Sequence, residues 1–288
     1  MAMLKIVGGK SDIYEECTFS KYNLDLTTGC VTSLHGKEGR CQYCYARLWN
    51  HHDLKVKNGI SRLDNQLKKL QDIEINGIKV GKWVRLGKMS DPGHYLTLPL
   101  LRLVLEKFKE FEVHPIIVTK LIDYHEDIAE LIKETQGILH ISLGYDELER
   151  GAAELGFDNM ARVIVAMNYL NDNVPTVARV VLDVTAPPSR MYLTAKLNKL
   201  PILVTPLRFA SKKIANKIGV DLSKYERYRG YYRPKWEYVL SEYKRMPMCG
   251  DLAGGVERCS LCLIPKFYKI KKLKKYVNIE PLGGSTHS

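Results

Sequence analysis

Strand-like and helix-like segments alternate along most of this chain, and this alternation limits the possible fold more than any other feature of the sequence. Six short segments are rich in β-branched residues and are bounded by Gly, Pro or Asp. They are residues 22–26, 83–88, 114–119, 138–143, 176–184 and 201–205. Residues 98–111, 125–135 and 159–171 carry apolar side chains at helical spacing. This order predicts an α/β fold with a parallel sheet, whose ligands lie at the carboxyl ends of the strands.

The number of strands indicates which kind of parallel sheet to expect. Six units are too few for a closed eight-stranded barrel, so we predict a partial (β/α)6 barrel. After Pro206 the composition changes, because residues 207–243 are basic and aromatic and residues 266–275 form a lysine-rich run. We therefore predict a barrel domain over residues 1–206 and a cysteine-containing C-terminal extension over residues 207–288.

Composition and charge narrow the cellular setting and the partner. The chain is 45% hydrophobic and 26% charged, as in ordinary soluble proteins. It has no apolar run approaching the ~20 residues that span a bilayer and no signal-peptide layout at its start, so we expect a cytoplasmic protein without a membrane partner. A net charge of +12 and a pI near 9.2 favour nucleic acid as the partner, although a lysine-rich solvated surface would give the same charge.

Three cysteines follow the first predicted strand, in the stretches T-T-G-C and G-R-C-Q-Y-C-Y-A. In a reducing compartment, cysteine groups of this kind favour metal ligation over disulfides. Cys30, Cys41 and Cys44 would supply three thiolates to a four-iron cluster and leave one iron open. Zinc would need a fourth protein ligand, for which His35 is available. The third interpretation is a set of reduced core cysteines.

A second cysteine group lies near the C-terminus and nearly repeats the spacing of the first. Cys249, Cys259 and Cys262 occur in M-C-G-D-L-A-G-G-V-E-R-C-S-L-C. This repetition predicts an auxiliary iron–sulfur cluster or a zinc site. Cys17, the one remaining cysteine, is either a fourth ligand of this second site or a buried apolar thiol.

With these cysteines placed after the first strand of a βα series, the chain resembles the radical S-adenosylmethionine (radical SAM) superfamily. The nearest likeness is to its spore photoproduct lyase-like branch and to the phage-associated three-cysteine-motif proteins. The resemblance covers roughly residues 20–205 and includes Tyr43 in the aromatic position before the third cysteine. Its other segments are G-K-M-S-D-P-G-H at 87–94, I-I-V-T-K at 116–120 and H-I-S-L-G at 140–144.

Two departures from the superfamily pattern stand out. Ten residues separate Cys30 from Cys41, where the superfamily commonly has three, although longer first loops occur in some branches. Ser90 and Asp91 stand where the second strand often ends in Gly-Gly-Glu.

The resemblance implies an enzyme and assigns roles to its residues. Cys30, Cys41 and Cys44 would hold a [4Fe–4S] cluster whose free iron binds S-adenosylmethionine. One electron, from a flavodoxin- or ferredoxin-type donor, would cleave this cofactor to a 5′-deoxyadenosyl radical, which takes hydrogen from the substrate. The residues expected to contact the cofactor are Tyr43, Ser90, Asp91, Lys120, Ser142 and Arg179.

An aromatic and basic segment at residues 225–236 points to the substrate. Aromatic rings can stack on bases, at ~1–3 kcal/mol per base, while guanidinium groups meet phosphates. The candidate nucleic-acid-binding residues are Arg227, Arg229, Tyr231, Arg233 and Lys235. A packed, tyrosine-rich segment is the alternative interpretation of the same residues.

Taken together, these features predict a radical SAM enzyme that modifies or repairs a nucleic-acid base, and DNA repair is one such reaction. Two other functions stay open. One is a radical SAM enzyme that acts on a peptide or protein, with the second cysteine group near that substrate. The other is a non-enzymatic zinc-binding nucleic-acid module, which would leave the polar strand ends at residues 87–94 and 116–120 without a purpose.

Overall fold

A single curved sheet organises the part of the chain described by the computed structural model, which comprises residues 4–6, 22–27, 63–75, 78–87, 90–143, 159–184, 190–228, 230–235 and 237–239. Its strand order is β1-β2-β5-β6-β7-β8-β9. β1 pairs antiparallel with β2, and every other neighbouring pair is parallel. The strands are β1 (Leu4–Ile6), β2 (Tyr22–Leu24), β5 (Lys82–Leu86), β6 (Val113–Thr119), β7 (Ile138–Leu143), β8 (Thr176–Leu182) and β9 (Ile202–Pro206). The predicted six parallel strands and the partial barrel are confirmed.

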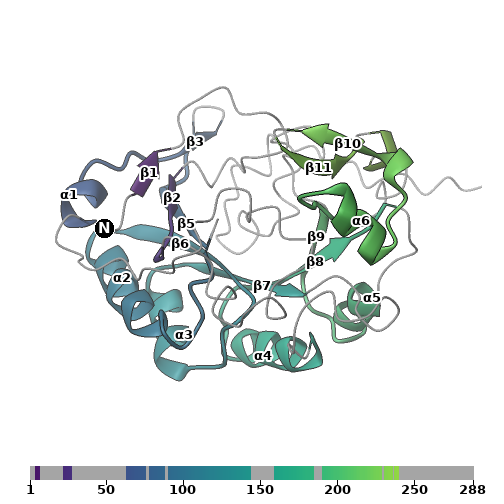
Figure 1. Cartoon of the computed structure of the whole chain (residues 1–288). Coiled ribbons are helices and arrows are strands. Elements are labelled where there is room, and N and C mark those ends of the chain that lie inside the picture. The colour runs from purple at the N-terminus through teal and green to yellow at the C-terminus, as the bar shows by residue number, and fades with distance from the viewer. Residues whose placement is uncertain are drawn as a thin grey trace, which may run out of the picture.

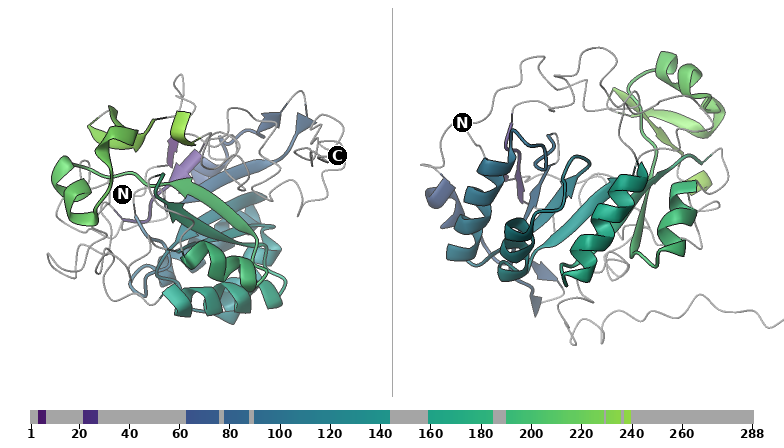
Figure 2. Two further views of the ribbon diagram at one scale, coloured as in Figure 1. Left: turned by 90° about the vertical axis from the view of Figure 1, so that its right-hand side faces the viewer. Right: turned by 90° about the horizontal axis from the view of Figure 1, so that it is seen from below.

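Helices cover the outer side of this sheet. Figure 1 shows these helices along the convex side of the curve, and the views in Figure 2 agree. They are α2 (Leu98–Glu110), α3 (Glu126–Glu134), α4 (Asn159–Asn171) and α5 (Arg190–Leu197). The first three were predicted from helical spacing. None of the described helices combines the length and the apolar character that crossing a bilayer requires.

Shorter elements lie at the two ends of the sheet (Figure 1). Near β1 are the helix α1 (Leu63–Leu67) and the small hairpin of β3 (Glu74–Ile75) and β4 (Ile78–Lys79). Near β9 are α6 (Lys212–Ile218), the 3-10 turn η4 (Leu222–Lys224) and a second hairpin of β10 (Tyr225–Tyr228) and β11 (Tyr231–Pro234). One hydrophobic cluster joins barrel residues to Phe209 and Tyr225 of this last region. The predicted domain boundary at residue 206 stays a prediction.

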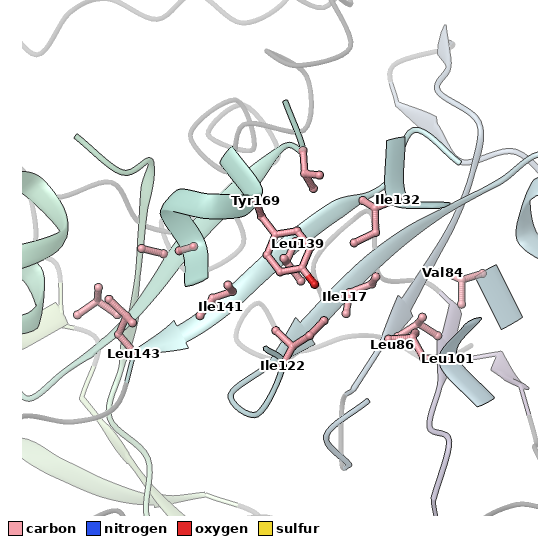
Figure 3. Packing of buried hydrophobic residues seen from close by; sticks show 14 of the residues in the cluster. Val84, Leu86, Leu101, Ile117, Ile122, Ile132, Leu139, Ile141, Leu143 and Tyr169 are labelled. Carbon is pink, nitrogen blue, oxygen red and sulfur yellow. The ribbon is translucent and has the colours of Figure 1, made fainter. Parts of the chain in front are cut away.

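The core lies between the sheet and the outer helices. Alternate strand residues such as Leu139 and Ile141 of β7 and Ile117 of β6 pack under Tyr169 of α4 (Figure 3). Successive side chains of a strand point to opposite faces. The residues between these core residues therefore lie on the face opposite the helices, which we call the inner face. Its polar residues include Asn23, Arg85, His114, His140, Ser142, Arg179 and Thr205.

Tyr169 ties α4 to the loop between β6 and α3. Its ring is buried, its hydroxyl donates to the carbonyl of Asp123 at 2.9 Å, and it accepts from the backbone N–H of His125 at 3.2 Å. Burial raises the pKa of this hydroxyl, so it stays protonated and able to donate.

The Tyr169→Phe variant is expected to lose about 1–2 kcal/mol of unfolding free energy. The substitution keeps the buried ring but leaves the backbone groups of Asp123 and His125 without this partner. Urea denaturation measures the loss. Tyr95→Phe is the matched control, because Tyr95 is 70% exposed, and it should change stability by less than about 0.5 kcal/mol. Equal stabilities of the two variants would contradict this role.

Candidate active site

The carboxyl ends of β5 and β6 are joined by one buried carboxylate, that of Asp91. Its Oδ1 accepts from the hydroxyl of Thr119 at 2.5 Å and from the N–H of Gly93 at 3.0 Å. Its Oδ2 accepts from the N–H of Lys120 at 2.7 Å. The carboxylate therefore holds the segment after β5 against the end of β6.

Burial raises the pKa of Asp91, and its hydrogen bonds with Thr119, Lys120 and Gly93 oppose that rise. Three donors converge on the two oxygens, which explains an acidic side chain at this buried position. The expected contact between Asp91 and the cofactor ammonium stays a prediction, since the hydrogen bonds described here are internal to the protein.

Two glycines allow the chain to pass this close to β6. A Cβ atom on Gly93 would lie 2.3 Å from the Thr119 hydroxyl oxygen and 2.6 Å from Cβ of Ile122. A Cβ atom on Gly87, whose φ is +84°, would lie 2.3 Å from the carbonyl oxygen of Val118. The glycines that flank K-M-S-D-P in the sequence are thus required by the backbone path.

A second carboxylate, Asp25, connects the end of β2 to the same edge. Its Oδ1 accepts from the backbone N–H of Ser90 at 3.1 Å and from the Ser90 hydroxyl at 3.0 Å. Sequence reasoning did not select Asp25, because it lay inside the strand predicted at residues 22–26, whereas β2 ends at Leu24. Asp25 and Asp91 together link the carboxyl ends of three neighbouring strands, β2, β5 and β6.

The remaining described cofactor candidates lie farther along the same edge. Lys120 directly follows β6, while Ser142 and Arg179 are register partners on β7 and β8. Hydroxyl, ammonium and guanidinium groups of this kind suit a ligand that carries a carboxylate. The structure thus brings Ser90, Asp91 and Lys120 together and places Ser142 beside Arg179. Tyr43 lies outside the described residues.

Three further polar residues of this region were not predicted from the sequence. Arg162 of α4 is buried, and its guanidinium donates to the carbonyl of Ser142 at 3.4 Å. Arg85 and His140 lie on the inner face, on β5 and β7. Burial, together with the positive charges of Arg179 and Arg85, lowers the pKa of His140 to about 3. The signal for His140 was its alternation with Leu139 and Ile141 in a strand.

Every predicted metal ligand lies outside the described residues. This applies to both cysteine groups and to the possible fourth ligand, that is, to Cys30, Cys41, Cys44, Cys249, Cys259, Cys262 and Cys17. Among the residues that the structure does describe, no group of three or more His, Cys, Asp or Glu side chains is arranged to hold a metal ion. The assignment of both metal sites therefore stays a prediction.

The predicted nucleic-acid segment forms the β10–β11 hairpin. Arg227 is exposed on β10, and Lys235, which directly follows β11, is half-buried. Arg233 instead pairs with Glu226 at 2.7 Å, and its guanidinium carbon lies 3.7 Å from the centre of the Tyr228 ring.

Tyr231 is only 1% exposed, so its ring is packed within the protein in this structure. Arg229 lies outside the described residues. Arg227 and Lys235 are therefore the described candidates with the least internal pairing.

Solved structures share the fold of this chain. A cysteine-to-serine mutant of spore photoproduct lyase matches with a TM-score of 0.55 and 16% identity, over 84% of this chain and 77% of the lyase. The lyase complexed with dinucleoside spore photoproduct matches with a TM-score of 0.53 and 17% identity, over the same shares of the two chains. The fold is that of spore photoproduct lyase. At this identity the likeness concerns the fold alone, and it confirms the fold that the sequence resemblance implies.

Other comparisons add little to the lyase match. SuiB of Streptococcus suis, bound to its precursor peptide SuiA, has a TM-score of 0.47 and 11% identity, over 68% of this chain and 40% of SuiB. No family model and no curated protein matches the sequence.

Proposed function

We propose that this protein is a radical SAM enzyme that modifies or repairs a nucleic-acid base. One observation carries the proposal: β2 ends at the polar edge of a barrel with the spore photoproduct lyase fold, and the three-cysteine segment follows β2 in the sequence. The polar edge supplies groups that suit an amino-acid cofactor, and the cysteines supply the thiolates that an iron–sulfur cluster needs.

The connection between the cysteine segment and the edge is short. Thr27 is the last described residue before that segment and precedes Cys30 by three residues, so their Cα atoms are at most about 11 Å apart. Asp25, two residues before Thr27, accepts hydrogen bonds from Ser90. These bonds fix this end of β2 beside β5. Cys30, Cys41 and Cys44 are thus the proposed ligands of a [4Fe–4S] cluster. When bound, such a cluster supplies an open iron position for S-adenosylmethionine and the electron for its reductive cleavage.

The described residues suit the charged groups of S-adenosylmethionine. Arg179 and Lys120 are cations that would bind its carboxylate, and the Ser142 hydroxyl would hydrogen-bond its carboxylate or ribose. Ser90 and Asp91 are proposed near its ammonium group, and Tyr43 near its adenine. The barrel would also exclude water from the reacting groups.

A nucleic-acid substrate is supported by charge and by the hairpin. The net charge of +12 favours a polyanion, and Arg227 on β10 is exposed where a phosphate could reach it. One structure with this fold is complexed with dinucleoside spore photoproduct, a lesion of two nucleosides. We infer the same class of substrate here. An electron donor of the flavodoxin or ferredoxin type is proposed from the chemistry alone.

Metal analysis of anaerobically purified protein tests the cluster. We expect about four irons and four sulfides bound through Cys30, Cys41 and Cys44. Cys249, Cys259 and Cys262, with Cys17 as a possible fourth ligand, would add a second cluster or a zinc. The serine variants of the first trio should lose the first four irons only. A colourless protein that contains zinc and no iron would contradict the proposal and favour a zinc-binding module.

Oligonucleotide binding tests the proposed substrate. The Arg227→Gln/Lys235→Gln variant should bind DNA about tenfold more weakly than the parent at low salt. The slope of its log Kd against the logarithm of the salt concentration should be shallower by about 1.5. Lys68→Gln is the matched control and should bind like the parent, because Lys68 is exposed and directly follows α1, which lies near β1 at the opposite end of the sheet. Equal salt dependence in the parent and the double variant would contradict a hairpin contact. Binding to peptides but not to DNA would favour a peptide substrate.

A further inference from the structure

The side chains of Arg179, His140 and Arg85 lie on the inner face at successive depths below the carboxyl edge. Arg179 of β8 is the register partner of Ser142, and His140 lies two residues before Ser142 on β7. His140 pairs with Val118 of β6, whereas Arg85 of β5 pairs with Ile116, two residues deeper. Arg85 and His140 therefore lie below the residues expected to bind the cofactor.

Both ring nitrogens of His140 and the Nε atom of the half-buried Arg85 are buried without a hydrogen-bond partner in the part of the chain that the structure describes. His140 as a whole is 5% exposed. Buried polar groups are nearly always hydrogen-bonded, because an unpaired one costs free energy. Three unpaired atoms on the same face therefore indicate a place for a ligand.

The charge at this place selects the kind of ligand. Among the described residues, Arg85 forms no ion pair with an acidic side chain. Its guanidinium and that of Arg179 both act electrostatically on His140, so the local potential is positive. A guanidinium is always charged and binds phosphate and carboxylate oxygens through its planar fork. The imidazole adds one N–H donor, and its other nitrogen can accept from a hydroxyl or amide group.

The geometry points to an anion site on the inner face, in which Arg85 and His140 bind a phosphate oxyanion. Its source is either the phosphodiester of the substrate or free inorganic phosphate. The first source rests on the proposed function, and the second does not. A substrate phosphate held here would fix the neighbouring base relative to the edge that carries Ser142 and Arg179. The two residues would then position the substrate rather than react with it.

Calorimetric titration of the full chain, without added cofactor, tests the site. Sodium phosphate is compared with sodium chloride at equal ionic strength, and a thymidine dinucleotide monophosphate is compared with thymidine. We expect phosphate or the dinucleotide to bind, and chloride and thymidine to bind at least about tenfold more weakly. Binding of the dinucleotide alone identifies the substrate phosphodiester, whereas binding of phosphate alone identifies the free ion. No preference of the parent protein for either phosphate compound would overturn the site.

Variants separate this site from general positive charge. Arg85→Gln and His140→Gln should each weaken phosphate binding about tenfold, while Lys68→Gln should leave it unchanged. Arg85→Lys keeps the charge, loses the fork and is expected to bind at an intermediate level, which provides a readout if Arg85→Gln fails to fold. Parent-like binding by folded Arg85→Lys and His140→Gln would overturn the site. Phosphate binding does not require the cluster, so the two proposals can fail separately. Cofactor cleavage without phosphate binding would overturn only this site. Phosphate binding without cofactor cleavage would overturn only the proposed function.

Discussion

When the pH falls from 6.5 to 4, the unfolding free energy of the His140→Gln variant is expected to decrease by about 3 kcal/mol less than that of the parent protein. In the unfolded chain the imidazole takes up a proton near pH 6.5, whereas in the folded protein its pKa is about 3. Over this interval the unfolded state binds a proton that the folded state does not. The parent therefore becomes less stable as the pH falls, and a glutamine at position 140 removes that contribution.

Urea titrations at several pH values between 7 and 4 measure this difference. Ile141→Val is the control, because it changes the neighbouring buried residue by one methylene without removing a titratable group. Its cost should be similar at every pH. Parallel stability curves for the parent and His140→Gln would show that His140 is not held in its neutral form by the fold.

Replacing Asp91 with alanine is expected to lower the unfolding free energy by about 3 kcal/mol. The substitution removes the shared acceptor of the Thr119 hydroxyl and of the Gly93 and Lys120 backbone N–H groups. Each of the three lost hydrogen bonds leaves a buried or half-buried donor unpaired. The free-energy cost of burying the carboxylate is also removed, which is why the net loss is smaller than three separate hydrogen-bond losses would suggest.

Chemical denaturation of Asp91→Ala and of the control Asp72→Ala measures this loss. Asp72 is exposed, so its removal should change stability by less than about 0.5 kcal/mol. Asp91→Asn should recover only part of the loss, because its amide group presents donors where two oxygens now accept. A stability equal to that of the Asp72 variant would contradict the role of Asp91 in joining β5 to β6.

The parallel sheet could be predicted from sequence because its strands are buried on both faces and read as apolar, β-branched runs. The clearest case is β7, predicted at residues 138–143 and found at Ile138–Leu143. The hairpin of β10 and β11 was not predicted. Its turn contains Gly230 with a φ of +93°, and its strands carry the aromatic and basic residues that were interpreted as a nucleic-acid segment. The ring of Tyr232 stacks on Phe209, a contact that local sequence does not reveal.

The candidate site could be predicted only in part. Ser90, Asp91 and Lys120 followed from motifs at strand ends, which the structure places at the same edge. Asp25 is 65 residues from its partner Ser90, so their contact depends on the register of two strands. The same holds for Arg85 and His140, which lie on strands separated by β6. Contacts across strands need the register, which a single sequence does not contain.

The most direct test of the proposed chemistry is the yield of 5′-deoxyadenosine after anaerobic incubation with S-adenosylmethionine and dithionite. The protein carrying its reconstituted cluster should form this product, and the serine variants of Cys30, Cys41 and Cys44 should form none above background. Absence of the product from the iron-loaded parent, or an equal yield from the serine variants, would contradict a radical SAM function.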